Sequence, residues 1–147
     1  NLKSLINEII TNTKNLNLIF PVHPRTAKML MSLGISHRRL HMIEPLGYLE
    51  FNYLVERSKA VITDSGGITE ETTVMGIPCM TLRNSTERPE TVDIGTNELL
   101  GVNPKAIKPA FEKLFSGKWK KGEVPELWDG KTSVRIVKHL IEILNEY

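Results

Sequence analysis

Short apolar segments rich in Ile, Val and Leu alternate along the chain with longer segments of helical periodicity. This alternation is typical of βαβ units, in which crossover helices join parallel strands. The expected strands are 16–22, 40–43, 60–63, 79–82 and 98–102. The expected helices are 2–13, 25–33, 49–58, 67–75, 89–94, 104–115 and 133–145. The sequence therefore predicts an α/β fold with five parallel strands in one doubly wound layer, and an irregular surface crossover over 116–131.

The length and charge balance are those of an ordinary globular domain. The chain has 147 residues, with 19 Lys and Arg against 17 Asp and Glu, and a formal net charge of +2. A net charge this small gives no strong positive surface that would attract nucleic acid or an acidic membrane, so neither partner is expected. No apolar stretch approaches the roughly 20 residues that cross a bilayer, and no signal peptide is recognisable. We therefore expect a soluble, cytoplasmic domain over residues 1–147.

The residue types that bind metals or form disulfides are sparse. The single cysteine, Cys79, cannot form an intrachain disulfide, which favours a reducing compartment. The four histidines are scattered and make no ligand set with it, so no metal is expected. The chain opens without Met, directly on a helical pattern, as though the numbering began inside a longer protein.

The segment AVITDSGGITEETTVMG, residues 60–76, is the most informative of the chain. An apolar strand ends at Asp64, the turn Ser65-Gly66-Gly67 follows, and a helical pattern then runs to Gly76. In an open parallel sheet, ligands bind where strands end and helices begin, and glycines there let a phosphate approach free backbone amides. The segment indicates an anion site at residues 65–67, although a helix cap with a tight turn would have the same sequence.

Two glutamates follow the glycine turn. Glu71 lies four residues beyond Gly67, so it returns to nearly the same helix face about 6 Å further along the axis. A carboxylate at that distance can accept hydrogen bonds from both hydroxyls of a ribose whose phosphates lie on the turn. Alternatively, acidic residues early in a helix complement its dipole, which fits Glu70 better than Glu71.

Three further candidates stand near the expected ends of strands. In RNSTERPE, residues 83–90, Thr86 and Arg88 could donate to phosphate or sugar oxygens, or could be a capping hydroxyl and a surface ion pair. Phe51 has the helical spacing of a core residue but could also stack on a base. His23, in PVHPR, follows the first strand.

Taken together, six blocks resemble, in order and spacing, the C-terminal half of the non-hydrolysing UDP-N-acetylglucosamine 2-epimerases. They are PVHP, EPLGYLEF, TDSGGITEE, GIPC, RNSTERPET with IGTNELLG, and LWDGKTSVRIV. The resemblance runs from about Leu18 to Leu144. It implies one of two Rossmann-like domains that face a cleft, the glycosyltransferase-B-type arrangement, with the N-terminal catalytic domain absent from this chain.

The resemblance also implies roles for individual residues. The uracil would lie beside Phe51, the phosphates on Ser65, Gly66 and Gly67, and the ribose hydroxyls on Glu71. The sugar side would be lined by Thr86 and Arg88. His23 matches the histidine of the family's HxNP block, although the Asn-Pro is replaced here by Arg25-Thr26. No catalytic acid or base is expected in this chain.

The activity implied is the interconversion of UDP-GlcNAc and UDP-ManNAc by inversion at C2, through elimination of UDP and its re-addition, with no external cofactor. The implied partners are these nucleotide sugars and the protein's own N-terminal domain, with a homodimer possible for the full-length protein. Three other functions stay open: the donor-nucleotide domain of a two-domain glycosyltransferase, a hydrolysing UDP-GlcNAc 2-epimerase, and a non-catalytic nucleotide-sugar binding module.

Overall fold

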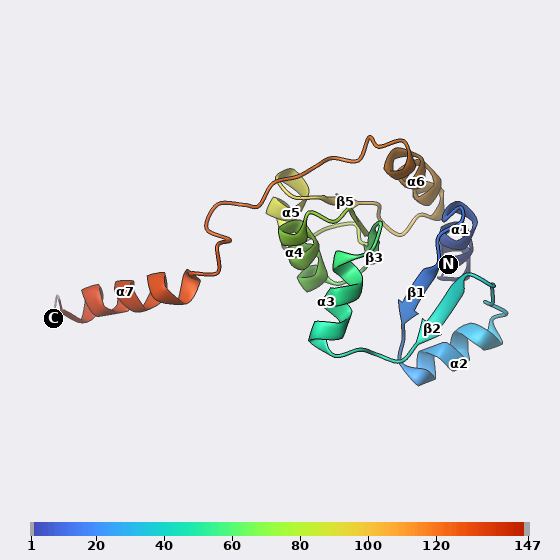
Figure 1. Cartoon of the computed structure of the whole chain (residues 1–147), viewed down its shortest axis with the longest axis horizontal. Coiled ribbons are helices and arrows are strands. Elements are labelled where there is room, and N and C mark those ends of the chain that lie inside the picture. The colour runs from blue at the N-terminus through green and yellow to red at the C-terminus, as the bar shows by residue number, and fades with distance from the viewer. Residues whose placement is uncertain (1, 146–147) are drawn as a thin grey trace.

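A computed structural model describes residues 2–145 of the chain (Figure 1). The strands are β1 (Leu18–Pro21), β2 (Leu40–Ile43), β3 (Val61–Thr63), β4 (Cys79–Thr81) and β5 (Asn97–Leu99). The helices are α1 (Leu2–Asn12), α2 (Pro24–Ser32), α3 (Tyr48–Glu56), α4 (Gly66–Met75), α5 (Pro89–Asp93), α6 (Ile107–Phe115) and α7 (Thr132–Asn145). A 3₁₀ turn, η1 (Pro104–Ala106), leads into α6. The alternating order confirms the α/β fold class predicted from the sequence.

The strands pair in parallel, but in two separate sets. β1 pairs with β2, from Leu18 opposite Leu40 to Pro21 opposite Ile43. The second sheet has the order β3-β4-β5. Among residues 2–145 no strand pairing joins the two sheets, so the expected single layer is not hydrogen-bonded as one. The apolar pattern locates the strands, whereas their lateral pairing depends on how the helices between them pack.

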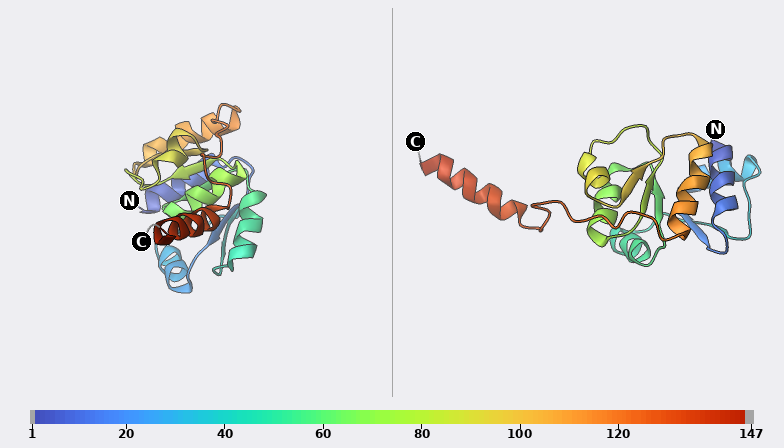
Figure 2. Two further views of the ribbon diagram at one scale, coloured as in Figure 1. Left: turned by 90° about the vertical axis from the view of Figure 1, so that its left-hand side faces the viewer. Right: turned by 90° about the horizontal axis from the view of Figure 1, so that it is seen from above.

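Helix α1 joins the two halves through its side chains. Leu5 and Ile9 belong to the core cluster that contains Met80 of β4, the inner face of α6 and Trp119. Ile6 and Ile10 belong to a second cluster, which is completed by Val22, Leu30 and Ile35 around β1, β2 and α2. Figure 2 shows α1 and α6 side by side at one end of the body. The four buried apolar residues of α1 therefore belong to two cores at once.

The space between α4, β4, α5 and β5 is filled largely by buried polar side chains. They are Thr69, Thr72, Thr73, Thr81, Thr91, Thr96 and Asn97. Each threonine hydroxyl donates to a carbonyl oxygen, most of them in the backbone and within one helical turn. Because buried polar groups are costly only when unpaired, this layer is compatible with a stable interior.

Residues 116–131 have no regular secondary structure, as predicted, but they are not wholly at the surface. The Trp119 ring is buried in the larger core, and its Nε1 donates to the backbone oxygen of Thr96 at 2.8 Å. Gly122 lies so close to Gly95 that a Cβ there would be 2.6 Å from the Gly95 carbonyl carbon. The segment is therefore attached to the corner between α5 and β5.

Beyond this segment, α7 projects from the body (Figure 1, red) and none of its described residues is buried. Arg135 donates to the Asp129 carboxylate at 3.0 Å and to the backbone oxygen of Leu127, which fixes the elbow that precedes the helix. The same guanidinium holds the pKa of Asp129 below its ordinary value. None of the helices within residues 2–145 combines the length and apolar character that a membrane span needs.

Candidate functional site

The turn between β3 and α4 presents unpaired backbone amides. Ser65 is the N-cap of α4, with extended backbone angles (φ −91°, ψ 129°), and its side chain makes no cap hydrogen bond. Its own N–H donates to the Thr63 hydroxyl at 3.0 Å. The first amides of the helix, beginning at Gly66 and Gly67, have no partner within the helix and point out of its positive end. The sequence's alternative interpretation, a serine side-chain cap, is not what the structure has.

The two glycines of this turn are not required by the protein's own geometry. Neither Gly66 nor Gly67 has a positive φ, and a Cβ built on either would meet nothing within 4 Å. By contrast, Gly76, the C-cap of the same helix, has a φ of +69°, which disfavours other residues. The absence of side chains at residues 66 and 67 thus leaves open space directly above the amides, which a phosphate could occupy.

The two glutamates of α4 have different surroundings. Glu70 Oε1 accepts a hydrogen bond from Arg88 Nε at 2.6 Å, and both side chains are partly exposed. The half-buried Glu71 carboxylate has no hydrogen bond or ion pair with any described residue. Glu71 is therefore free to accept hydrogen bonds from a ligand, whereas Glu70 holds an arginine.

The segment before α5 is a local hydrogen-bonded turn. The Arg88 N–H donates to the Thr86 hydroxyl oxygen at 3.0 Å, and Arg88 is the N-cap of α5. Pro89 is the first helical residue, as its position in the sequence predicts. The structure thus has both features of the structural alternative given above, a Thr86 hydroxyl that accepts from a backbone N–H and an Arg88 ion pair. Each group can still form further hydrogen bonds.

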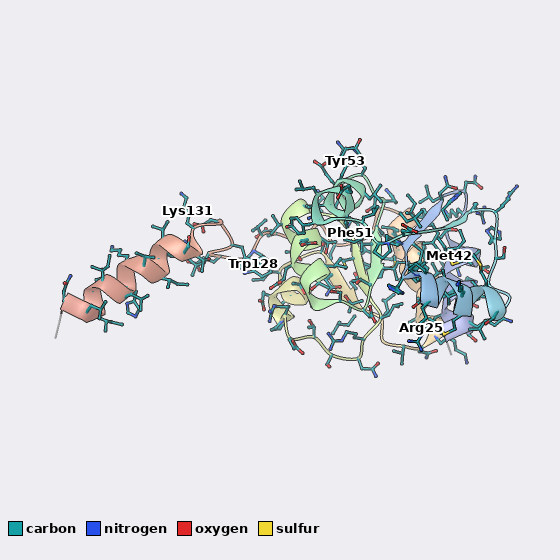
Figure 3. The ribbon with its side chains drawn as sticks, turned by 90° about the horizontal axis from the view of Figure 1, so that it is seen from below. Arg25, Met42, Phe51, Tyr53, Trp128 and Lys131 are labelled. Carbon is teal, nitrogen blue, oxygen red and sulfur yellow. The ribbon has the colours of Figure 1, made fainter. Side chains whose placement is uncertain are left out.

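Phe51 does not belong to either hydrophobic core. It is half-buried, and both core clusters are formed without it. Figure 3 shows it on the side of α3 that faces the rest of the body, while Tyr53 lies on the outer side. Because α3 contacts α4, Phe51 is carried on an element next to the glycine turn. The core interpretation of Phe51 is therefore not supported.

His23 has a local structural role. It is the N-cap of α2, and its Nδ1 accepts the Arg25 N–H at 3.3 Å. The ring is exposed and lies at the end of β1, in the other sheet. The structure therefore brings together the residues of α3, α4 and the start of α5, in that order of contact, but gives His23 a separate position.

The site lies on an open surface. One shallow hollow is lined by Ile43, Leu46, Leu49, Glu50, Tyr53 and Leu54, another lies between α1 and α6, and neither contains a predicted site residue. The only thiol, Cys79, is buried beneath the site, and burial raises its pKa above the ordinary value, so it remains protonated. Sequence reasoning missed the Glu70–Arg88 pair, because its partners are 18 residues apart and no local pattern links them.

Known proteins are similar to this chain in both sequence and fold. A sequence profile of the family described as UDP-N-acetylglucosamine 2-epimerase matches residues 1–141. A curated UDP-N-acetylglucosamine 2-epimerase of Methanocaldococcus jannaschii is 41% identical over 130 residues, which are 84% of this chain and 34% of that protein. The chain thus spans about a third of the length of the curated relatives it matches.

Two solved structures are also similar over nearly the whole chain. One is the M. jannaschii UDP-GlcNAc 2-epimerase in complex with UDP-GlcNAc and UDP, with a TM-score of 0.81 and 36% identity over 96% of this chain and 40% of the other. The second is the Neisseria meningitidis UDP-GlcNAc 2-epimerase bound to UDP-GlcNAc, with a TM-score of 0.81 and 32% identity over 95% of this chain and 40% of the other. With its profile match, its parallel α/β fold and these neighbours, the chain belongs to the UDP-N-acetylglucosamine 2-epimerase family.

Proposed function

We propose that this chain is the UDP-binding C-terminal domain of an enzyme that interconverts UDP-GlcNAc and UDP-ManNAc. The observation that carries the proposal is the first turn of α4, where two glycines keep space open over free amides and an unpaired carboxylate follows on the same helix. Two structurally similar relatives hold UDP-GlcNAc, which supports a nucleotide sugar as the ligand.

In this proposal the ligand lies along α4. The diphosphate accepts hydrogen bonds from the amides of Gly66 and Gly67 and from the Ser65 hydroxyl, which makes no cap hydrogen bond, and the helix dipole there also favours negative charge. Glu71, one helical turn further, accepts the ribose hydroxyls, and Phe51 on the neighbouring α3 provides the apolar surface for the uracil. Thr86 and Arg88 line the sugar side. His23 has a cap role of its own, so we assign it at most a peripheral contact.

The chemistry of the reaction explains why the enzyme must bind UDP tightly. Inversion at C2 through elimination breaks the bond between C1 and the diphosphate oxygen while a base removes the C2 proton. The proton returns from the other face, and UDP adds back to the 2-acetamidoglucal. Stabilising the departing diphosphate and retaining both fragments favour this route. The amides at the start of α4 and Arg88 would carry out these tasks, and the acid and base would come from the N-terminal domain.

The surface of α7 supports that second domain as the partner. Its apolar residues lie on one half of the helix, and its polar residues, apart from Ser133, lie on the other half. The apolar residues, all exposed, are Val134, Ile136, Val137, Leu140, Ile141, Ile143 and Leu144. An apolar face that covers half of the helix is typical of a helix packed on a globular domain, whereas a two-stranded coiled coil uses a narrower apolar stripe. About 60% of each of these relatives lies outside the part matched here, since this chain covers 40% of each.

A homodimer of the full-length protein and a cytoplasmic location remain predictions from the sequence. The donor domain of a glycosyltransferase would need the same grip on UDP, but the family match favours epimerisation.

Glu71→Ala should weaken UDP binding by the 147-residue chain roughly tenfold or more, since a charge-assisted hydrogen bond contributes about 1.5–3 kcal/mol. Gly66→Leu should also weaken binding, by filling the space over the amides, while leaving the fold intact because its Cβ meets no protein atom. Isothermal titration calorimetry measures both effects. Glu112→Ala, which removes an exposed glutamate of α6, serves as the control. Equal UDP affinity for wild type and Glu71→Ala would contradict the ribose assignment.

Phe51→Ala should reduce UDP affinity with little loss of stability. The matched variant Phe111→Ala removes a phenylalanine that is 5% exposed in the larger core, and should destabilise the chain by about 3–5 kcal/mol. Thermal unfolding and UDP titration of the two variants separate the roles. A melting shift for Phe51→Ala as large as that for Phe111→Ala, with unchanged affinity, would make Phe51 a core residue.

The 147-residue chain should bind UDP-GlcNAc without epimerising it, because proton removal and return need groups on both faces of C2. Incubation with UDP-GlcNAc in deuterated water, followed by NMR, detects either exchange at C2 or UDP-ManNAc. Turnover that copurifies with this chain would overturn the division of labour between the domains.

The apolar face of α7 should be needed for association with the N-terminal domain. When that domain is produced separately and mixed with this chain, sedimentation velocity should detect a complex. Ile141→Lys should abolish it by placing a charge on the contact face, and Lys138→Ala, on the polar face, should not. A complex that survives Ile141→Lys unchanged would show that α7 does not dock there.

A further inference from the structure

A chain of buried hydrogen bonds links the centre of the β3-β4-β5 sheet to the backbone of Arg88. The Thr81 hydroxyl, on β4, donates to Asn97 Oδ1 on β5 at 2.6 Å. Asn97 Nδ2 donates to the Thr91 hydroxyl oxygen on α5 at 3.1 Å. The Thr91 hydroxyl in turn donates to the backbone oxygen of Arg88 at 2.8 Å. We call this series, Thr81–Asn97–Thr91, the relay.

The relay has one consistent direction. Each hydroxyl has a single proton: Thr91 donates its proton to the Arg88 oxygen, and its own oxygen accepts from the Asn97 amide, so the two hydrogen bonds run in one direction. All three side chains are at most 2% exposed, so water cannot substitute for a lost partner. Removal of one hydroxyl would therefore leave a buried amide or carbonyl without its partner.

The element that the relay holds is a short helix. Helix α5 has only five residues, and its N-cap, Arg88, makes no side-chain cap hydrogen bond. Arg88 has other contacts as well: the Thr86 hydroxyl accepts its N–H, the Thr91 N–H donates to its carbonyl oxygen, and its guanidinium donates to Glu70 on α4 and to the Glu87 backbone oxygen. Among these hydrogen bonds, the relay is the one that connects the backbone of Arg88 to β4 and β5, while Glu70 holds the guanidinium against α4.

We infer that Asn97 and Thr91 are positioning residues for the nucleotide-sugar site, and act by fixing where Arg88 stands relative to the amides of Gly66 and Gly67. This inference rests on the proposed function, because it requires Arg88 to contact the ligand. Neither residue touches the ligand in this assignment, since both are buried beneath the segment that does.

A neighbouring threonine provides a matched control. Thr96 is 1% exposed, and its hydroxyl donates to the backbone oxygen of Ile77 at 2.6 Å, but it has no hydrogen bond to the relay or to Arg88. Thr91→Val and Thr96→Val each remove one buried hydroxyl at similar volume. Both should lower the melting temperature, whereas only Thr91→Val should reach the ligand site.

The test measures UDP-GlcNAc affinity by calorimetry in a double-mutant cycle on the 147-residue chain. In the presence of Arg88, Thr91→Val should weaken binding about fivefold, which is the effect of one hydrogen bond. In an Arg88→Ala background, the same substitution should have no further effect on affinity. Thr91→Ser, which keeps the hydroxyl, should restore the affinity, and Thr96→Val should bind like wild type.

Three outcomes would overturn the inference. They are unchanged affinity in Thr91→Val, an equal loss of affinity with and without Arg88, and an equal loss in Thr96→Val, which would indicate general loosening of the interior. These differ from a failure of the proposed function, in which the wild-type chain itself would not bind UDP-GlcNAc or Arg88→Ala would bind it as tightly.

Discussion

The packing of α1 between two hydrophobic cores is the interaction on which the remainder of the fold depends. Because no strand pairing connects β1-β2 with β3-β4-β5 among the described residues, side-chain burial has to hold these sheets together. Neighbouring residues on α1 divide the task, with Leu5 and Ile9 in one cluster and Ile6 and Ile10 in the other. Such contacts are not directional, so they fix the two halves through close packing and not through hydrogen-bond geometry. The relative position of β1 and the glycine turn therefore depends on this helix.

The region that carries the candidate site is built differently. Here the interior contains hydroxyls and an amide where other domains have aliphatic side chains, and the apolar contribution of α4 is correspondingly small. Hydrogen bonds specify distances and directions more narrowly than apolar contacts do, which suits elements whose ends must meet a ligand. The chain thus combines two apolar cores, both packed against α1, with a polar layer between α4, β4, α5 and β5, where Thr91 and Asn97 specify position.

Much of this architecture could be predicted from the sequence, because strand and helix patterns depend on local periodicity. The helices over 66–75 and 132–145 begin and end within one residue of the predicted limits, and Pro89 is at the predicted helix start. The separation of the sheets could not be predicted, since it depends on side chains of α1 that are far from β3 in the sequence. The same holds for the Glu70–Arg88 pair and for the Asn97 amide, whose two partners come from two other elements, β4 and α5. The burial of Trp119 was missed because its segment has no periodicity to place it.

The attachment of residues 119–125 to the body sets the length of the tether that carries α7. Trp119 is anchored in the core, the Glu123 N–H donates to the Ile94 oxygen, and Pro125 is buried, so the free chain starts only at residue 126. Seven residue steps separate Pro125 from Thr132, and a fully extended chain covers at most about 25 Å over that distance. The first residue of α7 is consequently confined to within about 25 Å of the corner between α5 and β5, and so is any surface on which the start of this helix packs.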